Sequence, residues 1–168
     1  VGFYSYNPPY IYNELKEPGK LGQGTIIAFD PNERPHLWQS PDEMRSAIEL
    51  AAQQSDWVFP TFPDAQVHFG DAAPLAVGRR YQSLGAIDVV VKNGADAAVL
   101  MTPTGSREIP ATAAEKVVDP TGAGDSFNGA YLAALLQGRD EPTALDWGHR
   151  MATVVIGQPG AIIARTPD

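Results

Sequence analysis

The chain alternates short apolar runs with longer segments whose apolar residues recur at helical spacing. The short runs are rich in β-branched and aromatic residues, which favour strands. They cover residues 25–29, 57–59, 87–92 and 97–101. Helices are expected at residues 40–54, 64–68, 73–84, 122–137 and 141–156. Strands that alternate with helices predict an α/β fold, a three-layer sandwich around a mostly parallel sheet.

Local signals support these boundaries. Ser40 precedes Pro41 and two acidic residues, which is typical of a helix start. Asn93-Gly94 predicts a turn into the run at 97–101, a hairpin partner or sheet edge, and residues 106–109 are a candidate to pair with it. Gly138 is placed to end the helix at 122–137.

Residues 1–24 differ from the rest of the chain. They are rich in tyrosine, proline and glycine and show neither a strand period nor a helix period. We expect them to form an irregular N-terminal arm or the remnant of a truncation. Residues 25–168 are expected to form one domain, and a chain of 168 residues is long enough for a sizeable core.

The composition narrows the classes of function. A formal net charge of −8 without a lysine and arginine cluster argues against a nucleic-acid partner. The absence of cysteine excludes disulfides, thiolate catalysis and cysteine-bound zinc. No apolar run approaches the ~20 residues that span a membrane, and the N-terminus lacks the pattern of a signal peptide. We expect a cytoplasmic protein with no membrane partner.

The strongest functional signal lies at residues 117–129. Val117-Val118 is expected to end a short strand, Gly122-Ala123-Gly124 to form a turn, and the next residues to begin an amphipathic helix. A helix start has unpaired N–H groups and a partial positive charge, which attract anions. Small residues leave these amides open to a phosphate, and parallel sheets bind ligands at the carboxyl ends of their strands.

Asp125 lies in the first turn of this helix, where its carboxylate would repel a phosphate. It can instead accept the proton of an attacking hydroxyl group, as the base of a kinase does. The residues alone leave open a second interpretation, a favourable acidic residue in an ordinary strand-to-helix turn. Neither a P-loop nor a Gly-x-Gly-x-x-Gly fingerprint is present, which disfavours those two nucleotide-binding folds.

The segment Asp119-Pro120-Thr121-Gly122-Ala123-Gly124-Asp125-Ser126-Phe127 resembles the C-terminal signature of the ribokinase-like (PfkB) carbohydrate kinases. In this family the glycine turn forms an anion hole, and the resemblance implies that role for residues 122–124. It also implies that Asp125 is the catalytic base and that Thr121 helps to frame the phosphate site. Asp119 is similar to a family residue near the nucleotide and a monovalent cation.

Three further segments resemble the family in the same order along the chain. Residues 29–38 resemble a motif of its 2-keto-3-deoxygluconate kinase branch, and Arg34 within them is expected to contact a sugar-acid carboxylate or the phosphates. Residues 90–96, with Asn93 and Gly94, resemble the strand and turn that border the nucleotide. Residues 158–163, with Gly160, resemble the C-terminal segment of the same branch.

The chain departs from the family pattern in two places. Where the family has an Asn-x-x-Glu motif that organises Mg²⁺ and phosphates, this chain has Thr61-Phe62-Pro63-Asp64. Asp64 is therefore expected to hold the metal through water. The N-terminal part of the family, with its lid and most sugar-binding residues, is not recognisable, so residues 25–168 resemble the C-terminal nucleotide-binding part.

The resemblance implies ATP-dependent phosphorylation of a sugar or sugar acid. The best candidate reaction converts 2-keto-3-deoxygluconate to its 6-phosphate. The implied cofactors are ATP and Mg²⁺, with K⁺ as a candidate monovalent cation. A fructokinase or nucleoside kinase of the same fold is one alternative, and a truncated, non-catalytic nucleotide-binding module is another. The sequence leaves the oligomeric state open.

Overall fold

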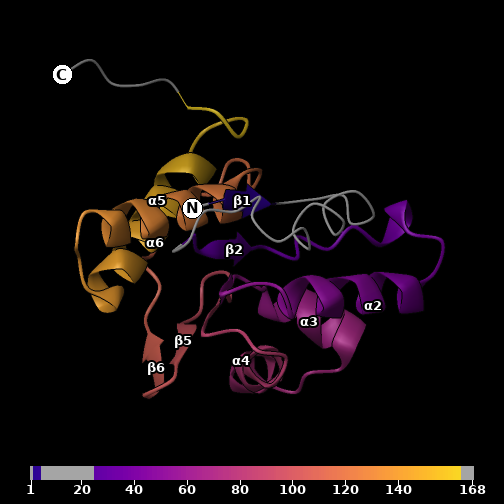
Figure 1. Cartoon of the computed structure of the whole chain (residues 1–168). Coiled ribbons are helices and arrows are strands. Elements are labelled where there is room, and N and C mark those ends of the chain that lie inside the picture. The colour runs from indigo at the N-terminus through magenta and orange to yellow at the C-terminus, as the bar shows by residue number, and fades with distance from the viewer. Residues whose placement is uncertain (1, 5–24, 164–168) are drawn as a thin grey trace. The chain divides into compact units, whose positions relative to one another are not determined.

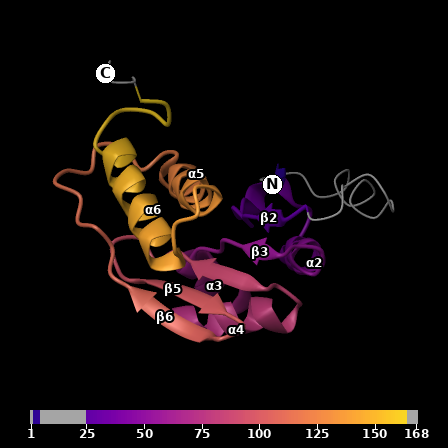
Figure 2. The same cartoon turned by 60° about the vertical axis from the view of Figure 1, so that its left-hand side comes forward.

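Six strands pair in sequence order into one sheet. The computed structural model describes residues 2–4 and 25–163. The strands are β1 (Gly2–Tyr4), β2 (Ile27–Phe29), β3 (Trp57–Val58), β4 (Asp88–Val91), β5 (Ala98–Thr102) and β6 (Gly105–Ile109). Strands β1 to β4 are parallel, and β5 is antiparallel to β4. Figure 2 shows β5 and β6 at one edge of the sheet.

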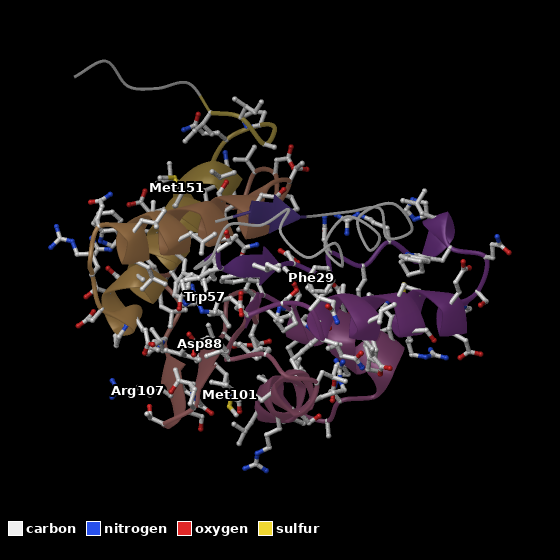
Figure 3. The ribbon with its side chains drawn as sticks, viewed as in Figure 1. Phe29, Trp57, Asp88, Met101, Arg107 and Met151 are labelled. Atoms are coloured by element: carbon white, nitrogen blue, oxygen red, sulfur yellow. The ribbon has the colours of Figure 1, made fainter. Side chains whose placement is uncertain are left out.

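The strand register brings distant residues together. Trp57 of β3 pairs with Asp88 of β4, and Val89 of β4 pairs with Met101 of β5. Figure 3 labels Trp57, Asp88 and Met101 on these three neighbouring strands. Val89, Val90 and Val91 are all buried, and a continuous apolar run of this kind is typical of a parallel strand.

Three helices connect the parallel strands: α2 (Pro41–Ala52), α3 (Phe62–Phe69) and α4 (Pro74–Ser83). A short 3₁₀ turn, η1 (Pro35–Leu37), precedes them. As predicted, the Ser40 side chain caps α2 by accepting the Glu43 N–H at 3.1 Å. Helix α3 ends at Gly70, whose φ of 76° is the left-handed conformation that glycine adopts without strain.

Helices α2, α3 and α4 pack on the sheet through one hydrophobic core. Its buried members include Met44, Ile48, Val58, Ala65, Val77, Tyr81, Val89, Val91, Val99 and Met101. Gly78 of α4 lets Met101 approach the helix closely, because a Cβ atom at this position would overlap the Met101 side chain (Figure 3). The core therefore depends on residues from β3 to β5 and from all three helices.

The chain divides into two compact units. The first contains Val1–Asn93 and Ala98–Glu108, and the second contains Gly94–Ala97 and Ile109–Asp168. The second unit is built on α5 (Ala123–Leu136) and α6 (Glu141–Ile156), orange and yellow in Figure 1. Gly148 allows these helices to pack closely, since a Cβ atom there would lie 2.9 Å from the Phe127 ring. Asp140 caps α6 by accepting the Thr143 N–H at 2.9 Å.

The predicted α/β fold with a mostly parallel sheet is confirmed, and two local predictions are wrong. Residues 2–4, predicted to be irregular, form β1, because their backbone pairs with the otherwise open edge of β2. Residues 5–24 of the predicted arm lie outside the described part of the chain.

Val117-Val118 does not form a strand. The N–H groups of Val118 and Asp119 both donate to the Ile156 carbonyl at the end of α6, at 2.7 and 3.1 Å. A helix end has carbonyls without intrahelical partners, and here these carbonyls take the two amides away from a strand ladder. The glycine turn therefore follows an irregular segment rather than the carboxyl end of a strand.

Among the helices formed by residues 25–163, none combines the length and the apolar character needed to cross a membrane.

Candidate functional site

The candidate residues fall into two groups, one in each unit. Arg34, Asp64 and Asn93 belong to the first unit. Those of the second unit are Gly94, Asp119, Thr121, Gly122, Ala123, Gly124, Asp125 and Gly160.

In the second unit, the Asp119 carboxylate joins the glycine turn to the segment after α6. Its Oδ1 accepts the Thr121 N–H at 2.9 Å, and its Oδ2 accepts the Gly160 N–H at 2.9 Å. Hydrogen bonds from the Thr121 side chain, the Thr121 backbone and the Gly160 backbone hold the pKa of Asp119 below its usual 3.8. Asp119 therefore braces the turn as an ionised acceptor.

Gly122 is required at the start of α5 for two reasons. Its φ of 79° lies in the left-handed region, and a Cβ atom there would come within 2.7 Å of the Ala161 Cβ. Any larger residue would strain the backbone and displace Ala161. The tight turn therefore depends on the absence of a side chain at this position.

The amides at the start of α5 are only partly used. Ala123 donates its N–H to the Pro120 carbonyl at 3.2 Å. The N–H groups of Gly122, Gly124 and Asp125 have no hydrogen-bond acceptor within the described residues. Asp125 lies in the first turn of α5 and is exposed. The turn thus presents open donors beside a carboxylate that solvent can reach.

In the first unit, charged residues follow the carboxyl ends of two parallel strands, β2 and β4, which lie on either side of β3. Asp30 follows β2 and Lys92 follows β4, and the Lys92 Nζ lies 2.6 Å from the Asp30 Oδ2. The side chains are only 11% and 5% exposed. The other Asp30 oxygen, Oδ1, accepts the Asn32 N–H at 3.0 Å. This edge of a parallel sheet is where ligands bind in such folds.

Arg34 and Asp64 lie beside this ion pair. Arg34 is exposed, and its Nη1 donates to the Glu33 carbonyl at 2.9 Å. Asp64 occupies the first turn of α3. Burial raises the pKa of Asp64, and the positive charges of His68, Arg34 and Lys92 oppose that rise. The structure therefore brings Asp64 within electrostatic reach of Arg34.

Asn93 and Gly94 follow directly after Lys92. Gly94 has a φ of 60°, so the turn predicted from Asn93-Gly94 is present. A substituent at Gly94 would have open space, with no heavy atom within 4 Å. Only the backbone conformation, and not a close contact, restricts this position.

Glu33 and Arg80 form a further group of charges inside the first unit. The Glu33 side chain is 3% exposed, and its Oε2 lies 3.7 Å from the His68 Nε2. Burial, with repulsion from Asp64, raises the pKa of Glu33 to about 7. The Arg80 Nε donates to the Asp71 Oδ2 at 2.9 Å, and its guanidinium stacks on the Phe69 ring at 3.9 Å.

The donor set for Mg²⁺ is small. In residues 25–163 no group of three or more His, Asp or Glu side chains is arranged to hold a metal ion. Mg²⁺ keeps several of its waters and is usually bound by one or two carboxylates together with substrate phosphates. A single carboxylate at Asp64 is compatible with that mode of binding.

Sequence reasoning missed three residues that shape the first group: Asp30, Glu33 and Lys92. Asp30 and Lys92 each follow an apolar strand, and charged residues at the carboxyl ends of parallel strands are a usable signal. Glu33 offers no such signal. Its burial comes from packing in the folded unit, which no local pattern records.

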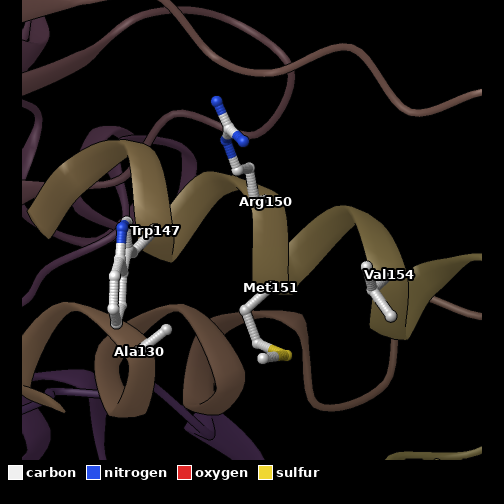
Figure 4. A pocket seen from close by; sticks show the side chains of 5 residues that line it. All are labelled: Ala130, Trp147, Arg150, Met151 and Val154. Carbon is white, nitrogen blue, oxygen red and sulfur yellow. The ribbon is translucent and has the colours of Figure 1, made fainter. Parts of the chain in front are cut away.

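The second unit also contains a pocket of about 230 Å³ between α5 and α6 (Figure 4). Its lining residues are Ala130, Trp147, Arg150, Met151 and Val154. The lining is mostly apolar and contains none of the residues proposed for phosphate chemistry. The structure gives no reason to connect it with the glycine turn.

The comparisons with known proteins agree on one family. The family model described as "pfkB family carbohydrate kinase" matches residues 3–168. The 2-dehydro-3-deoxygluconokinase of Dickeya dadantii (strain 3937) is 39% identical over 143 residues, which cover 83% of this chain and 46% of that protein.

Solved structures give the same result. A PfkB protein from Polaromonas sp. JS666 matches with a TM-score of 0.70 and 37% identity, over 82% of this chain and 45% of that one. A putative ribokinase II from E. coli, solved in complex with ATP and Mg²⁺, matches with a TM-score of 0.71 and 27% identity. The match covers 82% of this chain and 44% of that one. The chain therefore spans about half the length of the relatives that it matches.

Proposed function

Because this chain belongs to the pfkB family of carbohydrate kinases, we propose that it forms the nucleotide-binding part of an ATP-dependent sugar-acid kinase. Its fold is ribokinase-like. The observation that supports the proposal most strongly is the start of α5. There, amides without partners in the described chain, at Gly122 and Gly124, lie next to the exposed carboxylate of Asp125.

The role proposed for residues 122–124 is stabilisation of charge on the transferring phosphoryl group. Amides at a helix start are fixed donors that need no reorganisation when the charge develops. The left-handed conformation of Gly122 and the Asp119 brace support this role, since both hold the turn in one shape. Thr121, Asp119 and Gly160 are proposed to border the nucleotide on this side.

Asp125 is proposed as the base that accepts the proton of the attacking hydroxyl group. The carboxylate oxygen takes the proton while the hydroxyl oxygen bonds to phosphorus and ADP leaves. The exposure of Asp125 supports the assignment, because a substrate hydroxyl can reach it. A base of this kind typically contributes ~10²–10⁴-fold to the rate.

In the first unit, Arg34 is proposed to contact the phosphates or the sugar-acid carboxylate through its planar guanidinium. When bound, Mg²⁺ supplies neutralisation of the phosphate charge. Asp64 would hold it through water, and Asn93 and Gly94 would border the nucleotide. A K⁺ ion is proposed near Asp119, because each carboxylate oxygen that accepts one backbone N–H keeps a further lone pair.

The proposed substrate is 2-keto-3-deoxygluconate, also called 2-dehydro-3-deoxygluconate, with the 6-phosphate as product. The name of the Dickeya dadantii relative supports this choice. Fructose and nucleosides are the alternative substrates within the same fold. We also propose that the reaction takes place in the cytoplasm.

Calorimetric titration with MgATP, followed by an ADP-release assay, tests the proposal. The chain is expected to bind MgATP, and Asp125→Asn is expected to bind it as well or better, because a carboxylate near the phosphates is removed. Turnover by Asp125→Asn should fall at least ~10²-fold. Glu141→Gln, which changes the first-turn acid of α6, serves as the matched control. Near-wild-type turnover by Asp125→Asn would reject the base assignment.

The second candidate function is a nucleotide-binding module without catalysis. One observation favours it: Thr61 and Asp64 stand where the family has its Asn-x-x-Glu pair. MgATP binding without ADP release on 2-keto-3-deoxygluconate, fructose or a nucleoside would support this candidate. Absence of MgATP binding would reject both.

A further inference from the structure

Lys92 connects three segments that carry candidate residues. These are the loop with Arg34, the start of α3 with Asp64, and Asn93, which follows Lys92 directly. The Lys92 Nζ is 2.6 Å from the Asp30 Oδ2, across a sequence separation of 62 residues. Both side chains are largely buried. A buried ion pair adds little net stability because of its desolvation cost, but it restricts geometry strongly.

Through Asp30, Lys92 reaches the loop that carries Arg34. The second oxygen of Asp30 accepts the Asn32 N–H at 3.0 Å, and Asn32 has a φ of 38°. Asparagine adopts a positive φ more readily than other non-glycine residues, and the bond from its N–H to Asp30 fixes this conformation here. Arg34 then donates back to the Glu33 carbonyl at 2.9 Å. The path of this loop thus depends on the carboxylate that Lys92 holds.

Through its backbone, Lys92 also holds the start of α3. Its N–H donates to the Pro60 carbonyl at 2.8 Å, and its carbonyl accepts the Phe62 N–H at 2.8 Å. These bonds flank Thr61, which forms an isolated parallel bridge with Lys92. The first turn of α3 carries Asp64. Asn93 follows Lys92 directly.

We infer that Lys92 is a positioning residue that sets the placement of the Arg34 loop relative to the start of α3. It holds the loop through its ammonium group and the helix through its backbone, so it determines the spacing between Arg34 and Asp64. The functional meaning of this spacing rests on the proposed role of both residues at the nucleotide phosphates.

The test uses pyrophosphate titration of the 168-residue chain with three variants. Lys92→Met removes the charge and should weaken pyrophosphate binding about tenfold. The double variant Lys92→Met/Asp30→Asn also removes the negative charge that Lys92 balances, so it should regain folding stability but not affinity. Arg107→Met removes an exposed cation of β6 and should leave affinity unchanged.

A double variant that regains both stability and affinity would overturn the inference, because Lys92 would then act only on stability. The carbon NMR signals of the Arg34 Cδ and the Asp64 Cγ provide a readout that does not need a ligand. Both are expected to shift in the double variant and to remain in place in Arg107→Met. Unchanged signals would also overturn the inference.

The NMR arm separates the inference from the proposed function. If the wild-type chain does not bind pyrophosphate, the phosphate role of Arg34 fails. The carbon signals then still decide whether Lys92 positions the two residues.

Discussion

The two groups of candidate residues are held by opposite means. In the first unit, charged side chains are buried and matched by other side chains, as in the Lys92–Asp30 and Arg80–Asp71 pairs. In the second unit, the partly exposed Asp119 is matched by the backbone N–H groups of Thr121 and Gly160. The surroundings of the first group depend on the pairing of largely buried charges, and the second group depends on backbone conformation.

The pKa values reflect this difference. Burial raises the pKa of Glu33 to about 7, whereas hydrogen bonds lower the pKa of Asp119. A buried carboxyl group favours its neutral form, and one that accepts several N–H bonds favours its ionised form. The stability of the first unit should therefore change most when a charged group is removed. The stability of the second unit should change most when atoms are added to a tight turn.

The largest effect is expected when a buried charge of the first unit loses its partner. Arg80→Met would leave Asp71 unpaired and remove a guanidinium stacked on Phe69, so unfolding should become about 3–5 kcal/mol easier. Urea unfolding at neutral pH measures this change. The exposed neighbour Arg79 offers the control: Arg79→Met should change stability by about 0.5 kcal/mol or less. If Arg80→Met and Arg79→Met lost the same amount of stability, the pairing of Arg80 with Asp71 would not be important for the first unit.

The next effect should come from one added methyl group in the second unit. Gly122→Ala forces a side chain into a left-handed conformation and against Ala161, which should cost about 2–3 kcal/mol and weaken MgATP binding. Gly129→Ala adds the same group to α5 where no heavy atom lies within 4 Å. That variant should be neutral or stabilising by up to about 1 kcal/mol. Thermal unfolding and calorimetry would measure both, and a tolerated Gly122→Ala would remove the argument for a rigid turn.

A smaller, pH-dependent effect is expected at Glu33. Its pKa is about 7 in the folded chain and 4.5 in the unfolded chain, so the favourable neutral form is fully populated below pH 4.5. Stability is then lost as the pH rises towards 7. Glu33→Gln should abolish this loss. Above neutral pH its free energy of unfolding should exceed that of the wild type by about 2 kcal/mol, after discounting for solvent screening.

Urea unfolding across this pH range measures the Glu33 effect. The exposed Glu108 provides the control, since Glu108→Gln should follow the wild-type curve. If the wild type were more stable than Glu33→Gln at alkaline pH, the Glu33 carboxylate would be stabilising. The predicted direction of the pH effect would then be wrong.

The smallest effect is expected at Asp119, which lies closer to solvent. Its folded-state pKa is below the unfolded 3.8, so it stabilises the chain above that pH and the contribution disappears as the pH falls. Asp119→Asn should lower the urea midpoint slightly at neutral pH and match the wild type in acid. Thr143→Ala, at the Asp140 cap of α6, removes no acceptor and is a suitable comparison. If the urea midpoints of Asp119→Asn and the wild type differed equally at every pH, the charge of Asp119 would not contribute to stability.

Much of the local structure followed from the sequence. The Ser40 cap, the turn at Asn93-Gly94 and the end of α5 before Gly138 depend on a few neighbouring residues, and each is present where the pattern indicated. The family also followed from contiguous motifs, which a one-dimensional pattern preserves. The site assignments, from Arg34 to Asp125, remain predictions.

Other features were decided only by tertiary structure. The Asp30–Lys92 pair joins residues 62 positions apart, and Glu33 is buried by elements that follow it in sequence. The Val118 and Asp119 amides bond to the end of α6 rather than to a strand, because the last carbonyls of a helix lack intrahelical partners. Turns and caps depend on local steric and hydrogen-bonding preferences, whereas burial and charge pairing depend on which distant segments meet.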